Sequence, residues 1–140
     1  MANDSPVDRI TWTIIKCAMK VHSTLGPGLF ESVYLACVVF ELREAGFKVD
    51  VKVKLPLVYR GIQLDVAYEI DIIVNDLVVV ELKTVAAVLP VHHAQLLTYL
   101  KLTGKPVGLL FNFHSAHLKD GIVRKINTPR KDSETIVGLS

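Results

Sequence analysis

The spacing of apolar residues divides the chain into helical and extended stretches. In three stretches apolar residues recur three or four positions apart, which is typical of helices with a buried face. Prolines suited to a first helical turn and glycines suited to a helix end mark the boundaries of these stretches. The pattern predicts helices over about residues 5–25, 29–45 and 90–103.

Elsewhere the apolar period shortens to two, which predicts strands. From Val49 to Leu55 apolar residues alternate with charged ones, so we expect a strand with one face toward solvent. A hairpin centred on Gly61 follows, and its outgoing strand continues toward Asp71. A buried strand and an edge strand are predicted over residues 107–113 and 122–126.

The stretch from Asp71 to Lys83 places charged side chains where an apolar pattern dominates. Two apolar runs flank Asn75-Asp76, which predicts a buried hairpin with its acidic residues at the open end. A strict two-residue turn would put Asp71 and Glu81 on opposite faces of the sheet. We predict instead a three-residue loop that includes Leu77, or a one-residue bulge, either of which puts Asp71 opposite Glu81 with Lys83 on the same face.

Asp71 and Glu81 are then candidate metal ligands. Directly opposed residues have Cα atoms about 4.5 to 5.5 Å apart, close enough for two carboxylates to hold one cation. Hard oxygen ligands suit Mg²⁺, and Lys83 would lie beside the waters of such an ion. The alternative is that Asp71, Glu81 and Lys83 only mark where strands leave the core. No histidine pair has the spacing of a zinc helix, so zinc is not expected.

Further polar candidates lie on the predicted helices. Glu31 falls in the first turn of the second helix, where it either favours the helix dipole or points toward the acidic hairpin. Gln95 and Tyr99 are four residues apart on one face of the third helix. These two side chains either contact a phosphate or a water, or lie at the margin of a helix that serves only the core.

Length and composition indicate one domain. With 140 residues, 51% of them hydrophobic, the chain is expected to form a single domain over residues 1–128, followed by a polar tail over residues 129–140 that frays. No apolar run is long enough to span a membrane and no signal-peptide pattern is present, so we expect a cytoplasmic protein without a membrane partner. Cys17 and Cys37 lack metal-ligand spacing and are predicted to be reduced core residues.

The net charge of +2 permits contact with nucleic acid without demonstrating it. Basic residues gather toward the C-terminus, where they form either a nucleic-acid contact or a solvated face. These residues are Lys119, Arg124, Lys125, Arg130 and Lys131.

The order of these elements and motifs resembles the PD-(D/E)XK nuclease superfamily. The resemblance runs from about Ile14 to Ile126 and rests on Asp71, on Glu81-Leu82-Lys83 and on Gln95-Leu96-Leu97-Thr98-Tyr99. Within the superfamily the chain is most similar to the GxxExxY group, whose motif is matched by Gly28-Leu29-Phe30-Glu31-Ser32-Val33-Tyr34. Two positions depart from the superfamily pattern, since Ile70 replaces a proline and His93 replaces an acid.

The resemblance implies an α/β fold with a restriction-endonuclease-like mixed central sheet flanked by helices. It implies a Mg²⁺-dependent nuclease, with Mn²⁺ as a substitute, acting on nucleic acid and on DNA in preference to RNA. The implied metal ligands are Glu31, Asp71, Glu81 and the Leu82 carbonyl. Lys83 would position the attacking water or stabilise the phosphate charge, and Gln95 and Tyr99 would support Lys83 or the substrate. A homodimer fits this function, and a non-catalytic nucleic-acid-binding or regulatory module with the same fold is the alternative.

Overall fold

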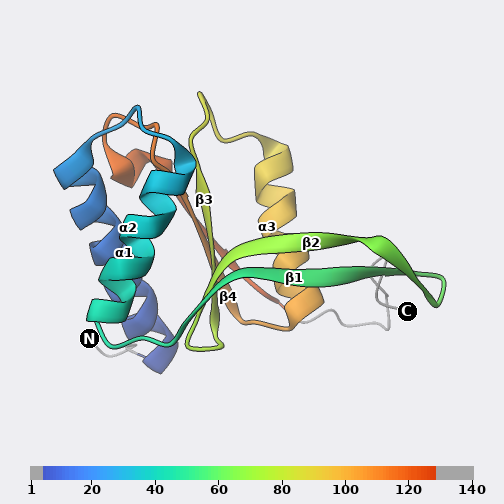
Figure 1. The fold of residues 1–140 in the computed structure, drawn as a ribbon. Helices are drawn as coiled ribbons and strands as arrows, with labels where there is room; N and C mark the ends of the chain where they lie inside the picture. The colour runs from blue at the N-terminus through green and yellow to red at the C-terminus, as the bar shows by residue number, and fades with distance from the viewer. Residues whose placement is uncertain (1–4, 129–140) are drawn as a thin grey trace.

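The structure, a computed structural model, describes residues 5–128 apart from the side chains of Val66 and Ala67. Three α-helices, one 3₁₀ turn and five strands follow one another in these residues (Figure 1). Their bounds are α1 (Pro6–Leu25), α2 (Glu31–Glu44), β1 (Val49–Tyr59), β2 (Ile62–Val74), β3 (Val78–Lys83), α3 (Pro90–Thr103), β4 (Val107–Asn112), η1 (Leu118–Gly121) and β5 (Ile122–Ile126). The predicted tail, with Arg130 and Lys131, lies outside the described residues.

The strands form one mixed sheet in the order β1-β2-β3-β4-β5. Neighbouring strands are antiparallel except β3 and β4, which are parallel and are connected through α3. A parallel pair requires such a crossover, because its second strand must start again at the same edge. The predicted fold class, a mixed central sheet flanked by helices, is therefore confirmed.

The helices cover both faces of the sheet, with α1 and α2 on one side of β3 and β4 and α3 on the other (Figure 1). Two groups of buried apolar side chains correspond to these two layers. Along β3, Val78, Val80 and Leu82 belong to the group under α1 and α2, whereas Val79 belongs to the group under α3. Because side chains alternate along a strand, Glu81 and Lys83 lie on the α3 side.

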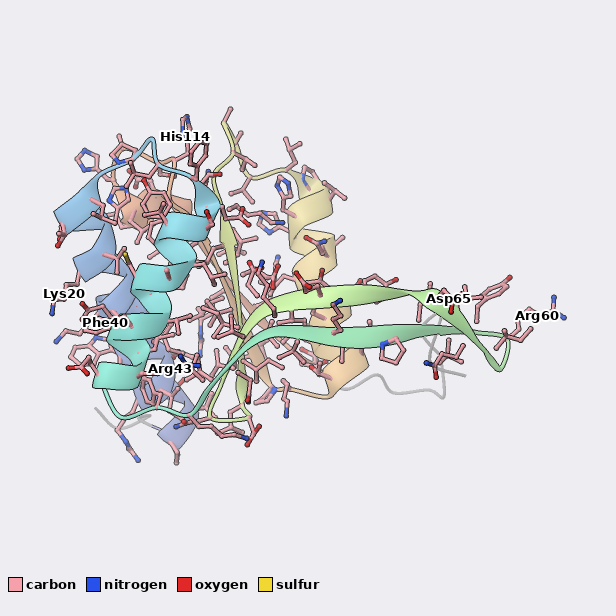
Figure 2. The ribbon with its side chains drawn as sticks, in the orientation of Figure 1. Lys20, Phe40, Arg43, Arg60, Asp65 and His114 are labelled. Carbon is pink, nitrogen blue, oxygen red and sulfur yellow. The ribbon has the colours of Figure 1, made fainter. Side chains whose placement is uncertain are left out.

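The β1–β2 ribbon is longer than the sequence predicted. β1 is one continuous strand, joined through Arg60 and Gly61 to β2, and the far end of the ribbon projects away from the helices, as Arg60 and Asp65 show in Figure 2. The register shifts between Pro56 and Val58. This irregularity in the pairing accommodates Pro56, which lies between the two strands that the sequence predicted.

The apolar residues of β1 contact both layers of the core. Val51 packs against the group under α1 and α2, while Val53 and Leu55 pack against the group under α3. Lys52 and Lys54 are exposed, as expected for the polar face of this strand. The change from one core layer to the other falls between Val51 and Val53.

The predicted helix boundaries agree with the structure to within two residues. The Ser5 hydroxyl accepts a hydrogen bond from the Asp8 N–H at 3.0 Å, which confirms the predicted helix cap. Cys17 and Cys37 are free thiols and half-buried. Among the helices of residues 5–128, none combines the length and the apolar character needed to cross a membrane.

Candidate active site

The β2–β3 hairpin has the three-residue loop that the sequence predicted. Val74 pairs with Val78, which leaves Asn75, Asp76 and Leu77 as a three-residue loop. Asn75 and Asp76 both have positive φ angles, of 51° and 56°, a conformation that asparagine and aspartate adopt more readily than most residues. The pairing continues in register through Ile72 and Val80, so the next position in each strand places Asp71 opposite Glu81.

Asp71 and Glu81 hold each other in place through the backbone. The Asp71 N–H donates to Glu81 Oε2 at 2.8 Å, and the Leu82 N–H donates to Asp71 Oδ2 at 2.9 Å. Both residues are buried, with 8% and 3% of their surface exposed. Each carboxylate therefore has one oxygen fixed by the neighbouring strand, while Asp71 Oδ1 and Glu81 Oε1 accept no hydrogen bond from that backbone.

The buried acids create a strongly negative environment. Burial, followed by the charge of Asp71, raises the pKa of Glu81 to about 8, although Lys83 acts in the opposite direction. Burial is also the main cause of the raised pKa of Glu31, with Asp71 adding to it and Lys83 opposing it. Like charges this close destabilise one another unless a cation compensates them. Either a proton on Glu81 or a bound cation therefore relieves this repulsion.

Glu31 approaches this environment from the first turn of α2. Its charge interacts with Asp71 and with Lys83, but within residues 5–128 it makes no hydrogen bond to either acid. The chain before α2 is held by Tyr34, whose hydroxyl donates to the Gly26 carbonyl and accepts from the Leu29 N–H at 3.2 Å. Tyr34, the tyrosine of the GxxExxY pattern, thus fixes the loop before α2, the helix that carries Glu31 in its first turn.

Lys83, Gln95 and Tyr99 lie on the α3 side of the same hairpin. The Lys83 Nζ donates to Gln95 Oε1 at 3.2 Å, which is one of the contacts that the resemblance implied for Gln95. Tyr99 is 3% exposed and packs edge-on against Tyr68, with ring centroids 5.9 Å apart. Burial, then the charge of Glu81, raises the pKa of Tyr99 to about 12, so its hydroxyl stays protonated beside the acids.

Asn112, at the end of β4, fixes the chain that follows Lys83. Its side-chain amide accepts from the Val85 N–H at 3.1 Å and donates to the Val85 carbonyl at 2.9 Å, and the Phe113 N–H donates to the Lys83 carbonyl at 2.8 Å. The sequence analysis predicted no role for Asn112. An asparagine at the end of a predicted buried strand is a signal that could have indicated one, because buried polar side chains need hydrogen-bond partners.

The donor set fits a hard divalent ion in part. Within residues 5–128, no three His, Cys, Asp or Glu side chains surround one common point. Asp71 and Glu81 supply two buried carboxylates, each with one oxygen that the neighbouring backbone does not bind. Mg²⁺ characteristically binds one or two carboxylates and keeps several waters. Among the described residues, Glu31 does not join Asp71 and Glu81 in a group of three such side chains, and the Leu82 carbonyl stays a predicted ligand.

Lys52 is a residue of this site that the sequence analysis missed. Its Nζ lies 3.5 Å from Asp71 Oδ1 and 3.6 Å from Glu69 Oε1. Because Lys52 alternates with apolar residues along β1, the sequence predicts that it faces solvent and indicates no role for it in the site. The contact depends on how β1 pairs with β2, for which the sequence near Lys52 carries no signal.

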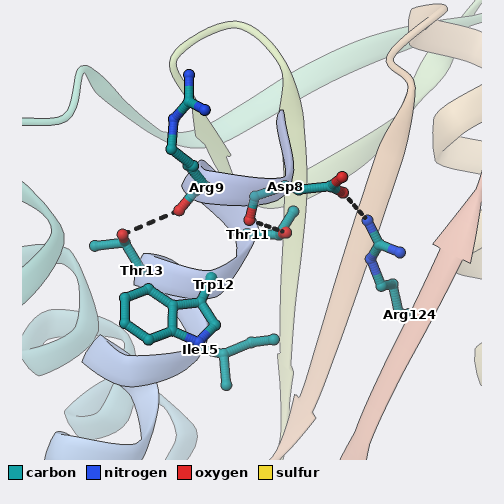
Figure 3. Close-up of a pocket in the computed structure, with 7 residues that line it drawn as sticks. All are labelled: Asp8, Arg9, Thr11, Trp12, Thr13, Ile15 and Arg124. Atoms are coloured by element: carbon teal, nitrogen blue, oxygen red, sulfur yellow. Dashed lines mark hydrogen bonds and ion pairs between the residues drawn. The ribbon is translucent and has the colours of Figure 1, made fainter. Parts of the chain in front are cut away.

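A hollow lies elsewhere on the molecule. It has a volume of about 670 Å³ and lies beside the start of α1, where Arg124 pairs with Asp8 at 3.0 Å and Trp12 is exposed (Figure 3). None of the predicted site residues lines it. The chemistry that the sequence predicts therefore belongs to the hairpin and not to this hollow.

The mixed sheet between helices, with paired acids and a lysine on its central hairpin, defines a restriction-endonuclease-like α/β domain. A family model of the PD-(D/E)XK nuclease superfamily matches residues 8–125, and the chain belongs to this superfamily. No curated protein and no solved structure matches the chain significantly.

Proposed function

We propose that the protein is a metal-dependent nuclease that hydrolyses phosphodiester bonds of nucleic acid. The observation that carries this proposal is the Asp71–Glu81 pair, two buried carboxylates that accept backbone N–H groups of the neighbouring strand through one oxygen each and leave the other oxygen without a backbone donor. Membership of a nuclease superfamily supports the same reaction class.

The roles of the side chains follow from their positions. Asp71 and Glu81 would hold a divalent ion through Oδ1 and Oε1, with Glu31 orienting water nearby. When bound, such an ion supplies positive charge at the phosphate and lowers the pKa of a water. Lys83 places a second positive charge on the same side of the hairpin, where it stabilises negative charge developing on the phosphate oxygens. Gln95 limits the freedom of the Lys83 side chain, and Tyr99 offers a protonated hydroxyl to the substrate.

The proposal is tested by incubating the protein with single- and double-stranded DNA and RNA in Mg²⁺, in Mn²⁺ and in EDTA. We expect cleavage in the presence of either metal and none in EDTA. Glu81→Gln and Lys83→Ala should each remove cleavage, because they eliminate a metal ligand and the cation beside the phosphate. Glu44→Gln, at the exposed end of α2, is the matched control and should cleave like the parent.

Two results would contradict this assignment. Cleavage that persists in both Glu81→Gln and Lys83→Ala would place the reaction elsewhere. Nucleic-acid binding without any product, and without dependence on metal, would identify the alternative, a non-catalytic binding or regulatory module that retains the fold.

Finer features belong to the same proposal. We place the chain in the GxxExxY group, with Mg²⁺ preferred, Mn²⁺ as substitute, and DNA preferred over RNA. We propose that residues 1–128 act as one domain in the cytoplasm. A homodimer would allow both strands of a duplex to be cut. Light scattering with and without DNA measures the oligomeric state.

A further inference from the structure

Lys52 has an unusual backbone conformation for a residue inside a strand. Its φ angle is +54°, in the left-handed region that residues with a side chain rarely adopt. The residues on either side of Lys52 pair with the residues on either side of Asp71 without a shift in register. Lys52, Asp71 and Glu81 therefore form a row across three strands, and the strained position is the one at the end of that row.

The Lys52 ammonium group lies beside Asp71 Oδ1, the carboxylate oxygen that no backbone N–H of β3 binds. Asp71 Oδ2 accepts the Leu82 N–H at 2.9 Å, whereas Lys52 Nζ lies 3.5 Å from Asp71 Oδ1. This is the oxygen that the proposed metal site uses. A divalent ion at Asp71 therefore shares or replaces the Lys52 ammonium group, and the repulsion between the two cations favours release of the lysine.

Lys52 is also the more exposed of the two lysines beside the acids, Lys52 and Lys83. Its side chain is 47% exposed, against 11% for the Asp71 side chain that it contacts. Lys83 is half-buried and is already engaged with Gln95. A polyanion that approaches the acids from solvent therefore meets the ammonium group of Lys52 at the edge of the site.

We propose that Lys52 is a substrate-binding residue of this site, whose ammonium group neutralises Asp71 in the metal-free protein and contacts a backbone phosphate of the nucleic acid once a divalent ion is bound. This inference rests on the proposed nuclease function. It adds a second basic residue to the site and makes metal binding the event that frees it for the substrate. Glu69, the other partner of Lys52, is exposed and keeps the released side chain near the site.

The first test measures metal binding without any substrate. Mg²⁺ is titrated calorimetrically into the wild-type protein, Lys52→Gln and Lys54→Gln. Lys54 is an exposed lysine of the same strand that, in the described part of the chain, forms no salt bridge with Asp71. We expect Lys52→Gln to bind Mg²⁺ about two- to fivefold more tightly, because a partly exposed ion pair no longer competes for Asp71. Lys54→Gln should match the wild-type protein.

The second test measures nucleic-acid binding separately from cleavage. In a Lys83→Ala background, the affinity for a short fluorescent DNA duplex is measured against salt concentration in Mg²⁺ and in EDTA. Loss of one phosphate contact reduces the slope of log affinity against log salt by about 0.9. We expect Lys52→Gln to produce this reduction in Mg²⁺ and a smaller one in EDTA, where the ammonium stays on Asp71. Lys52→Arg, which keeps the charge, should restore the slope.

The outcomes separate this inference from the function on which it rests. If the wild-type protein cuts DNA but Lys52→Gln alters neither the Mg²⁺ affinity nor the slope in Mg²⁺, the role of Lys52 is overturned and the nuclease stands. A change in metal affinity alone would make Lys52 a neutralising residue without substrate contact, which also overturns the inference. If the wild-type protein neither binds Mg²⁺ nor cuts, the proposed function fails.

Discussion

Glu81 is the residue whose charge depends most on its surroundings. Burial, then Asp71, raises its pKa from 4.5 to about 8 in the folded protein. The folded state therefore binds the proton more tightly than the unfolded chain, and the metal-free protein loses stability as the pH rises from about the unfolded value through the folded one. We expect the melting temperature in EDTA to fall between about pH 5 and pH 8.

The matched control for this prediction is Glu81→Gln, which keeps the shape of the side chain and cannot ionise. Its melting temperature should change less with pH over the same interval than that of the wild-type protein. Equal slopes for the two proteins would show that Glu81 is not the group that titrates.

Gln95 is a positioning residue that acts through Lys83. Gln95→Leu removes the oxygen that accepts the Lys83 ammonium at 3.2 Å, so the lysine samples more orientations. If cleavage is established, kcat should fall about 10-fold, as for other residues that orient a group in a site. Gln63→Leu, an exposed change on β2, serves as the control. An unchanged kcat in Gln95→Leu would remove this role, provided that both variants melt like the parent.

The main candidate site residues could be picked out from the sequence because their chemistry conflicts with their surroundings. Asp71, Glu81 and Lys83 are charged positions in an apolar stretch, and such conflicts mark functional sites. Lys52 offers no such conflict, since a lysine between apolar residues is what an exposed strand face requires. Its contact with Asp71 depends on the strand register and on a positive φ angle, and neither follows from the local pattern.

At the scale of the elements, one hydroxyl group holds the loop before α2. Tyr34 is fully buried, stacks on Phe113 with centroids 4.5 Å apart, and bonds the loop through Gly26 and Leu29. Tyr34→Phe leaves a backbone N–H and a carbonyl without this partner. We expect a loss of about 1 to 3 kcal/mol in the free energy of unfolding, measured by urea denaturation.

Tyr59→Phe provides the comparison for Tyr34→Phe, because Tyr59 is 51% exposed on the projecting ribbon. Its unfolding free energy should stay within about 0.5 kcal/mol of the parent. If both variants unfold alike, the hydroxyl of Tyr34 does not hold the loop. In that event the position of Glu31 would have to depend on α2 packing alone.

The elements themselves were largely predictable, because helical and extended periods are local properties of the sequence. Because side chains alternate between the two faces of a strand, the sequence left two possibilities for the β2–β3 connection, a three-residue loop or a one-residue bulge. The structure has the three-residue loop. The β1–β2 ribbon was predicted less well. The sequence predicted one strand to Leu55 and a separate hairpin around Gly61, yet β1 runs from Val49 to Tyr59 with a register shift between Pro56 and Val58. The turn of the ribbon from one core layer to the other is a tertiary effect that no local period encodes.

At the scale of the whole molecule, the site connects parts of the fold that lie far apart in sequence. Glu31 comes from one helical layer, Gln95 and Tyr99 come from the other, and the acids lie on the sheet between them. The α3 layer is tightly packed there, since a Cβ added at Gly108 would lie 2.8 Å from Leu96 Cδ1. The β2–β3 pairing brings Asp71 and Glu81 together, whereas Glu31, Gln95 and Tyr99 join them only when both helical layers are assembled on the sheet.

This dependence predicts that a divalent ion stabilises the entire fold. An ion that binds the folded state alone adds RT ln(1 + [L]/Kd), or about 2.7 kcal/mol at a concentration one hundred times Kd. Asp71 and Glu81 come together only through the β2–β3 pairing, so the unfolded chain offers no comparable site. We expect Mg²⁺ to raise the melting temperature of the wild-type protein in a concentration-dependent manner, and to leave Asp71→Asn and Glu81→Gln almost unchanged. Because melting requires no substrate, an equal rise in the two variants would locate the ion away from the hairpin, whether or not the protein cuts nucleic acid.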